Sequence, residues 1–180
     1  MTIFVARHGE TEWNALDKVC GRSDIPLSEK GHTQAKLLAE KIKSEQDKNQ
    51  ITRIFVSPLT RARQTCAYIE NTLGLIATVE NDLIEMNFGT SEGKNLHSSE
   101  FNKFKEEPFL HFPNGESYME LSFRAKHLLQ KLYSQYQNEN ILLVCHGALG
   151  RAIATCFHDF TIEQFKHMRM KNCELCKYEM

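Results

Sequence analysis

The sequence lacks an excess of charge of either sign. Its 22 lysines and arginines are balanced by 23 aspartates and glutamates, and the formal net charge is −1. Proteins that bind nucleic acids rely on clustered positive charge, which displaces counterions from the phosphate backbone. We therefore expect no nucleic-acid partner.

Long apolar runs are also missing. The longest are short, as in residues 141–145, whereas a membrane helix needs about 20 apolar residues. Residues 1–6 run directly into Arg7 and His8, without the basic flank and apolar stretch of a signal peptide. These observations predict a cytoplasmic protein with no membrane partner.

Metal-binding and cofactor motifs are equally scarce. The only CxxC is formed by Cys173 and Cys176, and the nearby His158 and His167 do not complete a familiar zinc spacing. No glycine-rich nucleotide loop occurs. We expect no metal or cofactor, full activity in chelator, and the two cysteines on the same or adjacent faces of a terminal strand.

What the sequence does contain is an alternation of apolar strands and amphipathic helices. The predicted strands cover residues 2–6, 54–56, 75–79 and 141–145. Predicted helices begin at Ser28, follow residue 58 as far as Gly74, centre on residues 121–132, and cover residues 148–157. The pattern predicts a single α/β domain over residues 1–180, a three-layer sandwich with a mainly parallel sheet.

Residues 85–117 break this alternation. The segment has no strand period and is punctuated by glycine and proline. Long irregular segments in compact domains are usually functional. We therefore predict a partly helical insertion that lies over the mouth of a site.

Polar side chains follow the predicted strands directly. Arg7 and His8 follow the first strand, Arg61 lies shortly after the second, Glu85 comes after the third, and His146 follows the fourth. Ligands of open α/β sheets bind beyond the carboxyl ends of the strands. Arginine binds two phosphate oxygens at once, and a neutral imidazole can attack phosphorus. Each residue alone is more often structural, but their joint placement favours a phosphoryl site.

Six short segments spread along the chain form an ordered set of motifs. They are residues 7–14 (RHGETEWN), 24–35 (DIPLSEKGHTQA), 57–65 (SPLTRARQT), 85–89 (EMNFG) with 92–93 (EG), 115–117 (GES) and 144–147 (VCHG). The set resembles the histidine phosphatase superfamily, in its phosphoglycerate-mutase-like branch, which includes α-ribazole and broad-specificity phosphatases. The resemblance covers almost the whole chain and implies that family's fold.

The resemblance also implies residue roles. His8 is expected to be the nucleophile that becomes phosphorylated, with the Gly9 carbonyl fixing its tautomer. Glu85 is expected to protonate the leaving oxygen and then activate water; burial favours its protonated form and the arginines oppose it. The expected phosphate- and substrate-binding residues are Arg7, Asn14, Cys20, Gly21, Arg61, His146 and Gly147.

The superfamily contains mutases and phosphatases, and this chain departs from the mutase pattern. Mutases follow the acid with an arginine and an aromatic, whereas Met86 and Asn87 follow Glu85 here. No arginine lies between Arg63 and Arg124, and the cations of the insertion are Lys94, Lys103 and Lys105. A doubly anionic acid is expected to be poorly held, so water should accept the phosphoryl group.

The sequence thus predicts a monophosphatase acting on a small organic phosphate ester. A mutase and an inactive phosphate- or partner-binding module are the alternatives. Two interpretations stay open for the aromatic side chains of the insertion, which form either an apolar wall for the leaving group or the insertion's own core. They are Phe88, Phe101, Phe104, Phe109 and Phe112. Residues 173–180 resemble the start of a strand whose edge is exposed or covered in a homodimer.

Overall fold

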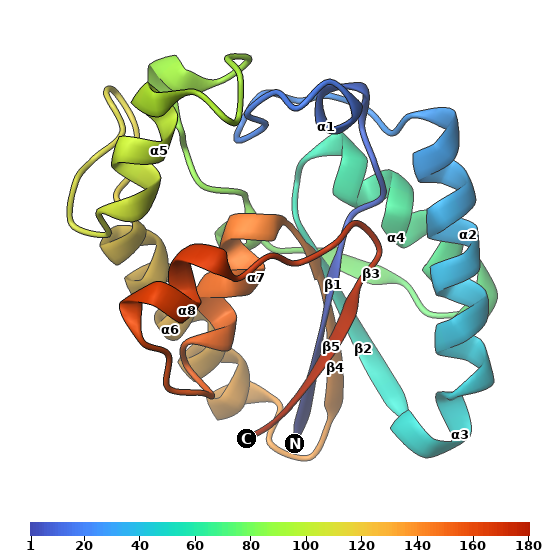
Figure 1. Ribbon diagram of the computed structural model, residues 1–180. Coiled ribbons are helices and arrows are strands. Elements are labelled where there is room, and N and C mark those ends of the chain that lie inside the picture. Colours follow the sequence, from blue (N-terminus) through green and yellow to red (C-terminus); the bar gives the residue numbers. More distant parts are fainter.

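The computed structural model describes residues 1–180 as a five-stranded sheet with helices on both faces (Figure 1). The strands lie in the order β3-β2-β4-β1-β5. They are β1 (Thr2–Arg7), β2 (Ile51–Val56), β3 (Ala77–Val79), β4 (Asn140–Cys145) and β5 (Leu175–Glu179). The first four are parallel, and β5 runs antiparallel to β1. The predicted mainly parallel sheet is confirmed.

Side chains alternate between the two faces of the sheet along each strand. Both faces carry apolar side chains, and helices cover each face as an outer layer. Phe4 and Ala6 of β1 pack toward α2 (Glu29–Ser44) and α4 (Thr60–Leu73). Ile3 and Val5 belong to the larger core on the other face, under α6 (Tyr118–Gln135) and α7 (Gly147–Ala154). Figure 1 shows these two pairs of helices on opposite sides of the sheet. This is the predicted three-layer sandwich.

Local signals place the ends of these helices where expected. Ser28 caps α2 by accepting from the Gly31 N–H, and Gly74 ends α4 in the left-handed conformation. A Cβ on Gly9 would lie 2.5 Å from the Gly31 carbonyl oxygen. Because Gly9 and Gly31 have no side chains, the segment after β1 packs directly on the start of α2.

Several short elements complete the chain. They are α1 (Glu12–Ala15), α3 (Gln46–Asn49), η1 (Asn81–Leu83), η2 (Gly89–Ser91), α5 (Ser99–Glu106) and α8 (Ile162–His167). The sequence did not predict α8, because none of its residues is buried and it has no apolar stripe. No helix combines the length and apolar content that a membrane crossing requires.

The predicted insertion contains η2 and α5, and its aromatic side chains form a cluster that is continuous with the larger core of the sheet. Phe112 lies 5.0 Å from Phe88, 5.3 Å from Phe101 and 5.4 Å from Phe104 between ring centroids. Phe109 is 69% exposed and lies outside this cluster. Phe88 and Phe101 also line the cavity described below. The clustered rings therefore pack within the larger core, and a role of Phe88 and Phe101 as a wall for the leaving group stays a prediction.

The carboxyl-terminal strand differs from expectation in one detail. Cys176 lies within β5, but Cys173 precedes it with a left-handed backbone (φ 56°). The two cysteines therefore do not share one strand. β5 forms the outer edge of the sheet beside β1.

Candidate active site

The carboxyl ends of β1, β2 and β4 bring together residues that are distant in the sequence. His8 follows β1, Arg61 lies in the first turn of α4 after β2, and His146 follows β4. Glu85 lies between η1 and η2 and reaches the first turn of α7. All four side chains are buried.

The His8 imidazole is held by a partner on each ring nitrogen. Its Nδ1 lies 2.6 Å from the Gly9 carbonyl oxygen, and Arg61 Nε donates to its Nε2 at 3.2 Å. Because arginine is only a donor, Nε2 is an acceptor and the ring proton is on Nδ1. Burial, followed by the charges of Arg61 and Arg7, holds the pKa of His8 well below its usual value. The ring is a neutral base whose Nε2 lone pair accepts the hydrogen bond from Arg61.

Arg61 is completely buried and uses all three of its nitrogen groups. Besides the bond to His8, Nη1 donates to the Ser23 carbonyl at 2.9 Å and Nη2 to the Gly21 carbonyl at 2.6 Å. Gly21, predicted to contact substrate, therefore contacts Arg61 through its carbonyl. The Gly21 carbonyl therefore helps to fix the position of the Arg61 guanidinium.

His146 lies beside His8, with the ring centroids 5.1 Å apart. Its Nε2 is hydrogen-bonded to Ser57 Oγ at 2.7 Å, whereas its Nδ1 is buried without a partner. Burial and the charge of Arg61 hold the pKa of His146 well below its usual value. Ser57 was not among the predicted site residues, although it directly follows β2. The sequence signal that could have identified Ser57 is its position directly after a strand.

The Glu85 carboxyl group sits against the amino end of α7. Oε1 accepts from the N–H groups of Met86 at 2.8 Å and Leu149 at 3.0 Å, and Oε2 accepts from Ala148 N–H at 2.9 Å. A carboxylate offers about four lone-pair sites. Oε2 therefore keeps one site free for a proton while three main-chain groups fix the orientation of the carboxyl plane.

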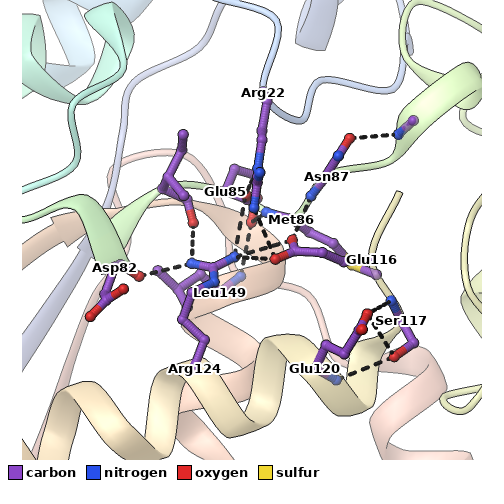
Figure 2. Close-up of polar contacts among 12 residues, drawn as sticks. Arg22, Asp82, Glu85, Met86, Asn87, Glu116, Ser117, Glu120, Arg124 and Leu149 are labelled. Atoms are coloured by element: carbon purple, nitrogen blue, oxygen red, sulfur yellow. Dashed lines mark hydrogen bonds and ion pairs between the residues drawn. The ribbon is translucent and has the colours of Figure 1, made fainter. Parts of the chain in front are cut away.

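A salt bridge fixes the segment that carries Glu85 (Figure 2). Arg124 Nη1 donates to the carbonyls of Asp82 at 2.8 Å and Ile84 at 2.6 Å, and its Nη2 lies 3.2 Å from Glu116 Oε2. The same Glu116 oxygen accepts from the Asn87 N–H at 2.7 Å. The pair thus holds the chain on both sides of Glu85. Neither residue was predicted as part of the site.

A cavity of about 170 Å³ opens in front of these residues. Of the predicted residues, it is lined by Arg7, Asn14, Cys20, Glu85 and Gly147. Arg7 Nη1 donates to the Met170 carbonyl at 2.6 Å, while its Nε is buried without a partner. His8, Arg61 and His146 do not line the cavity. All three side chains are buried.

Asn14 and Cys20 face the cavity in different ways. Asn14 Oδ1 accepts from the Thr11 N–H at 3.1 Å and from Asn172 Nδ2 at 3.3 Å, so its own amide NH₂ remains available as a donor. Asn172 also donates to the His8 carbonyl at 3.0 Å and was not predicted. Burial raises the pKa of the Cys20 thiol, which keeps it neutral.

The cavity wall also contains cations that the sequence analysis missed. Besides Lys105 from the insertion, Lys18, Arg151 and Arg169 line it. The expectation that a second anionic group would be poorly held considered only the insertion, and three further cations line the cavity. How firmly the site holds such a group stays a prediction. Arg151 comes from α7 and Arg169 from the loop after α8, so no local pattern linked them to the insertion. No cluster of three or more His, Cys, Asp or Glu side chains is arranged to hold a metal ion.

Comparison with known proteins gives consistent matches. The family model of the histidine phosphatase superfamily (branch 1) matches residues 3–180. "Probable phosphoglycerate mutase GpmB" of Photorhabdus laumondii is 34% identical over 187 residues, covering 99% of this chain and 85% of that protein.

Solved structures also resemble this fold. A mutant phosphoserine phosphatase of Entamoeba histolytica, in complex with phosphoserine, has a TM-score of 0.84 and 27% identity, covering 98% of this chain and 89% of that one. The mycobacterial glucosyl-3-phosphoglycerate phosphatase has a TM-score of 0.84 and 24% identity, with 98% and 88% covered. At that identity the likeness concerns the fold alone.

Proposed function

Because the chain belongs to branch 1 of the histidine phosphatase superfamily, we propose that it is a phosphomonoesterase that acts through a phosphohistidine on His8. The observation that carries this proposal is the His8 ring. The Gly9 carbonyl accepts a hydrogen bond from Nδ1–H, so Nε2 carries the basic lone pair of the ring. A neutral, oriented imidazole is the form of histidine that attacks phosphorus.

In the first step, His8 Nε2 forms a bond to phosphorus and the bond from phosphorus to the ester oxygen breaks. Oε2 of Glu85 delivers a proton to the departing oxygen, which leaves as an alcohol. Arg61 Nε, which donates to the Nε2 lone pair at rest, moves its hydrogen bond to a phosphoryl oxygen. Arg7 Nε and His146 Nδ1, both buried without partners, are available to the other phosphoryl oxygens.

In the second step, the Glu85 carboxylate takes a proton from water. The water oxygen bonds to phosphorus, the bond from phosphorus to Nε2 breaks, and inorganic phosphate leaves. His8 returns to its neutral form and Glu85 to its protonated form. Each residue therefore ends the cycle in its starting state.

Mutase activity is the second candidate, and two observations favour it. The relative at 34% identity is named a phosphoglycerate mutase, and the cavity has cations available for a second anionic group. A mutase returns the phosphoryl group to the bound intermediate instead of to water. Hydrolysis is preferred because Met86 and Asn87 follow Glu85, where the mutases of the family carry an arginine and an aromatic. The solved structure at 27% identity is likewise a phosphatase.

The experiment is a product analysis with 3-phosphoglycerate and a panel of phosphomonoesters, in chelator. We expect inorganic phosphate to be released, and none from the His8→Ala variant. Formation of 2-phosphoglycerate faster than phosphate release from any ester would establish the mutase instead. No turnover together with tight phosphate binding would indicate an inactive binding module.

A further inference from the structure

Arg61 carries a buried charge without a carboxylate in direct contact. Its side chain is completely buried, and no ion pair of the protein includes it. Two of its hydrogen bonds end on the main-chain carbonyls of Gly21 and Ser23, and the third ends on neutral His8. Buried charges are normally paired. The groups that fix these neutral partners therefore also fix Arg61.

The carboxylate of Glu92 holds the same short segment from another direction. Its Oε1 accepts from the Arg22 N–H at 2.7 Å, and its Oε2 accepts from the Ser23 N–H at 2.6 Å and from the Ser23 hydroxyl. The Gly21 carbonyl and the Arg22 N–H belong to one peptide group. That peptide therefore accepts from the Arg61 guanidinium and donates to the Glu92 carboxylate. Hydrogen bonds in such a chain polarise and strengthen one another.

Gly21 permits this close approach because it has no side chain. A Cβ at this position would lie 2.5 Å from the Met86 carbonyl oxygen and 2.6 Å from Glu92 Oε1. Both distances are too short for a real Cβ contact. A side chain here would therefore displace the peptide that lies between Arg61 and Glu92.

Main-chain pairing fixes Glu92 beside this segment. Glu92 directly follows η2. The next residue, Gly93, donates its N–H to the Val19 carbonyl at 2.9 Å, and the Val19 N–H donates to the Lys94 carbonyl at 2.9 Å. These bonds join the insertion to the chain just before Gly21, so the position of the Glu92 backbone is set independently of its carboxylate contacts.

We propose that Glu92 is a positioning residue that holds the Arg61 guanidinium in place through the peptide groups of residues 21–23. The inference rests on the proposed function, in which Arg61 Nε leaves His8 Nε2 and turns to a phosphoryl oxygen. During that change of partner, the two Nη groups stay anchored on the carbonyls of residues 21 and 23. Glu92 does not line the cavity, so it acts on the reaction through Arg61.

The first test compares Glu92→Gln with the unmodified enzyme. The NH₂ of the amide would face one of the N–H groups that now donate to Glu92, so one anchor is lost. We expect kcat/KM for p-nitrophenyl phosphate, per folded enzyme, to fall about 10–100-fold, the size of effect that a displacement of about 1 Å produces. Inorganic phosphate should bind about tenfold more weakly by calorimetry, because a charge-assisted hydrogen bond from Arg61 is weakened.

¹⁵N NMR of His8 gives a readout that a loss of stability alone does not change. When Arg61 Nε moves away in Glu92→Gln, the signal of His8 Nε2 should shift toward that of a lone pair without a donor. The ring should also take up its second proton at a higher pH, because the charge of Arg61 is one cause of the lowered pKa of His8. Ser23→Ala, which removes only the hydroxyl contact with Glu92, should cause smaller changes in the same direction.

Two control variants separate this effect from other roles of the segment. Glu100→Gln removes a carboxylate of α5 that forms an exposed ion pair outside the cavity, and it should change neither the kinetics nor the NMR signals. Arg22→Gln breaks the ion pair with Glu116 but keeps the peptide group, and it should leave the His8 signals in place. His8 signals displaced as far in Arg22→Gln as in Glu92→Gln would overturn the inference.

Phosphate binding and NMR keep the inference testable apart from turnover. If the unmodified protein hydrolyses no ester but Glu92→Gln weakens phosphate binding and moves the His8 signals, the proposed function fails and the positioning role stands. If esters are hydrolysed and the His8 signals stay in place in both Glu92→Gln and Ser23→Ala, the positioning role fails alone.

Discussion

Arg61 Nε donates a hydrogen bond to His8 Nε2 over 3.2 Å, so the nucleophilic lone pair is occupied in the resting protein. The bond keeps the ring neutral and fixes its tautomer, since the Gly9 carbonyl holds the other nitrogen. It must also be released before Nε2 can reach phosphorus. Arg61 therefore holds the His8 imidazole in its neutral, reactive tautomer before substrate binds. Once attack begins, the same arginine donates its hydrogen bond to the phosphoryl group.

This arrangement predicts an unusual titration of His8. The imidazole should remain neutral, with its proton on Nδ1, well below the usual histidine pKa of about 6.5, because burial and the charges of Arg61 and Arg7 lower the pKa of His8. ¹⁵N NMR of the histidine side chains, assigned with His8→Gln, measures both the tautomer and the protonation state. A His8 ring that becomes doubly protonated near pH 6.5 would contradict this account of the site.

Glu85→Gln should slow the chemistry according to the leaving group. Turnover of alkyl phosphates should fall about a hundredfold or more, because the amide cannot supply a proton. Turnover of p-nitrophenyl phosphate should fall much less, since its leaving group needs little protonation. Equal losses on both substrates would assign the proton to another residue.

The amide also has a structural cost that needs a control. Its NH₂ would face one of the N–H groups that now donate to Glu85, from Ala148, Met86 or Leu149. Loss of one such bond is expected to lower the free energy of unfolding by about 1–3 kcal/mol. Chemical denaturation measures that loss, and the leaving-group dependence is independent of it.

Arg124→Gln should displace Glu85 without touching substrate. The substitution removes the charge that ties Glu116 to the carbonyls before Glu85, so we expect kcat to fall about tenfold with little change in KM. The free energy of unfolding should fall by about 2 kcal/mol. Arg53→Gln breaks another arginine–carboxylate pair, with Glu139, away from the cavity and should leave kcat unchanged. An unchanged kcat in Arg124→Gln would show that Glu85 is positioned by α7 alone.

The sheet, the main helices and the central residues were predictable from sequence because each has a local signal. Strands such as β4 are continuous apolar runs, and α4 has an apolar stripe that ends at a glycine. His8 and His146 directly follow strands, where ligands of parallel sheets bind. Element α8 lacked such a signal, since it buries no residue.

Residues defined only by tertiary contacts could not be predicted. Arg151 and Arg169 share the cavity wall with Lys105 although they lie 46 and 64 positions further along the chain. Arg124 and Glu116 support Glu85 through main-chain carbonyls and amides, which have no sequence code. Gly21 was expected to contact substrate, but its carbonyl contact with Arg61 is a tertiary contact that no local sequence pattern indicates.

The central claim is that the phosphoryl group passes through His8 to water. Rapid mixing with 3-phosphoglycerate or p-nitrophenyl phosphate, alkaline quenching and mass spectrometry of the peptides measure it most directly. We predict a transient phosphoryl group on the peptide containing His8, on Nε2, which forms before phosphate appears and decays at the rate of phosphate release. Phosphate release without a phosphorylated His8 peptide, or undiminished in His8→Ala, would contradict the account.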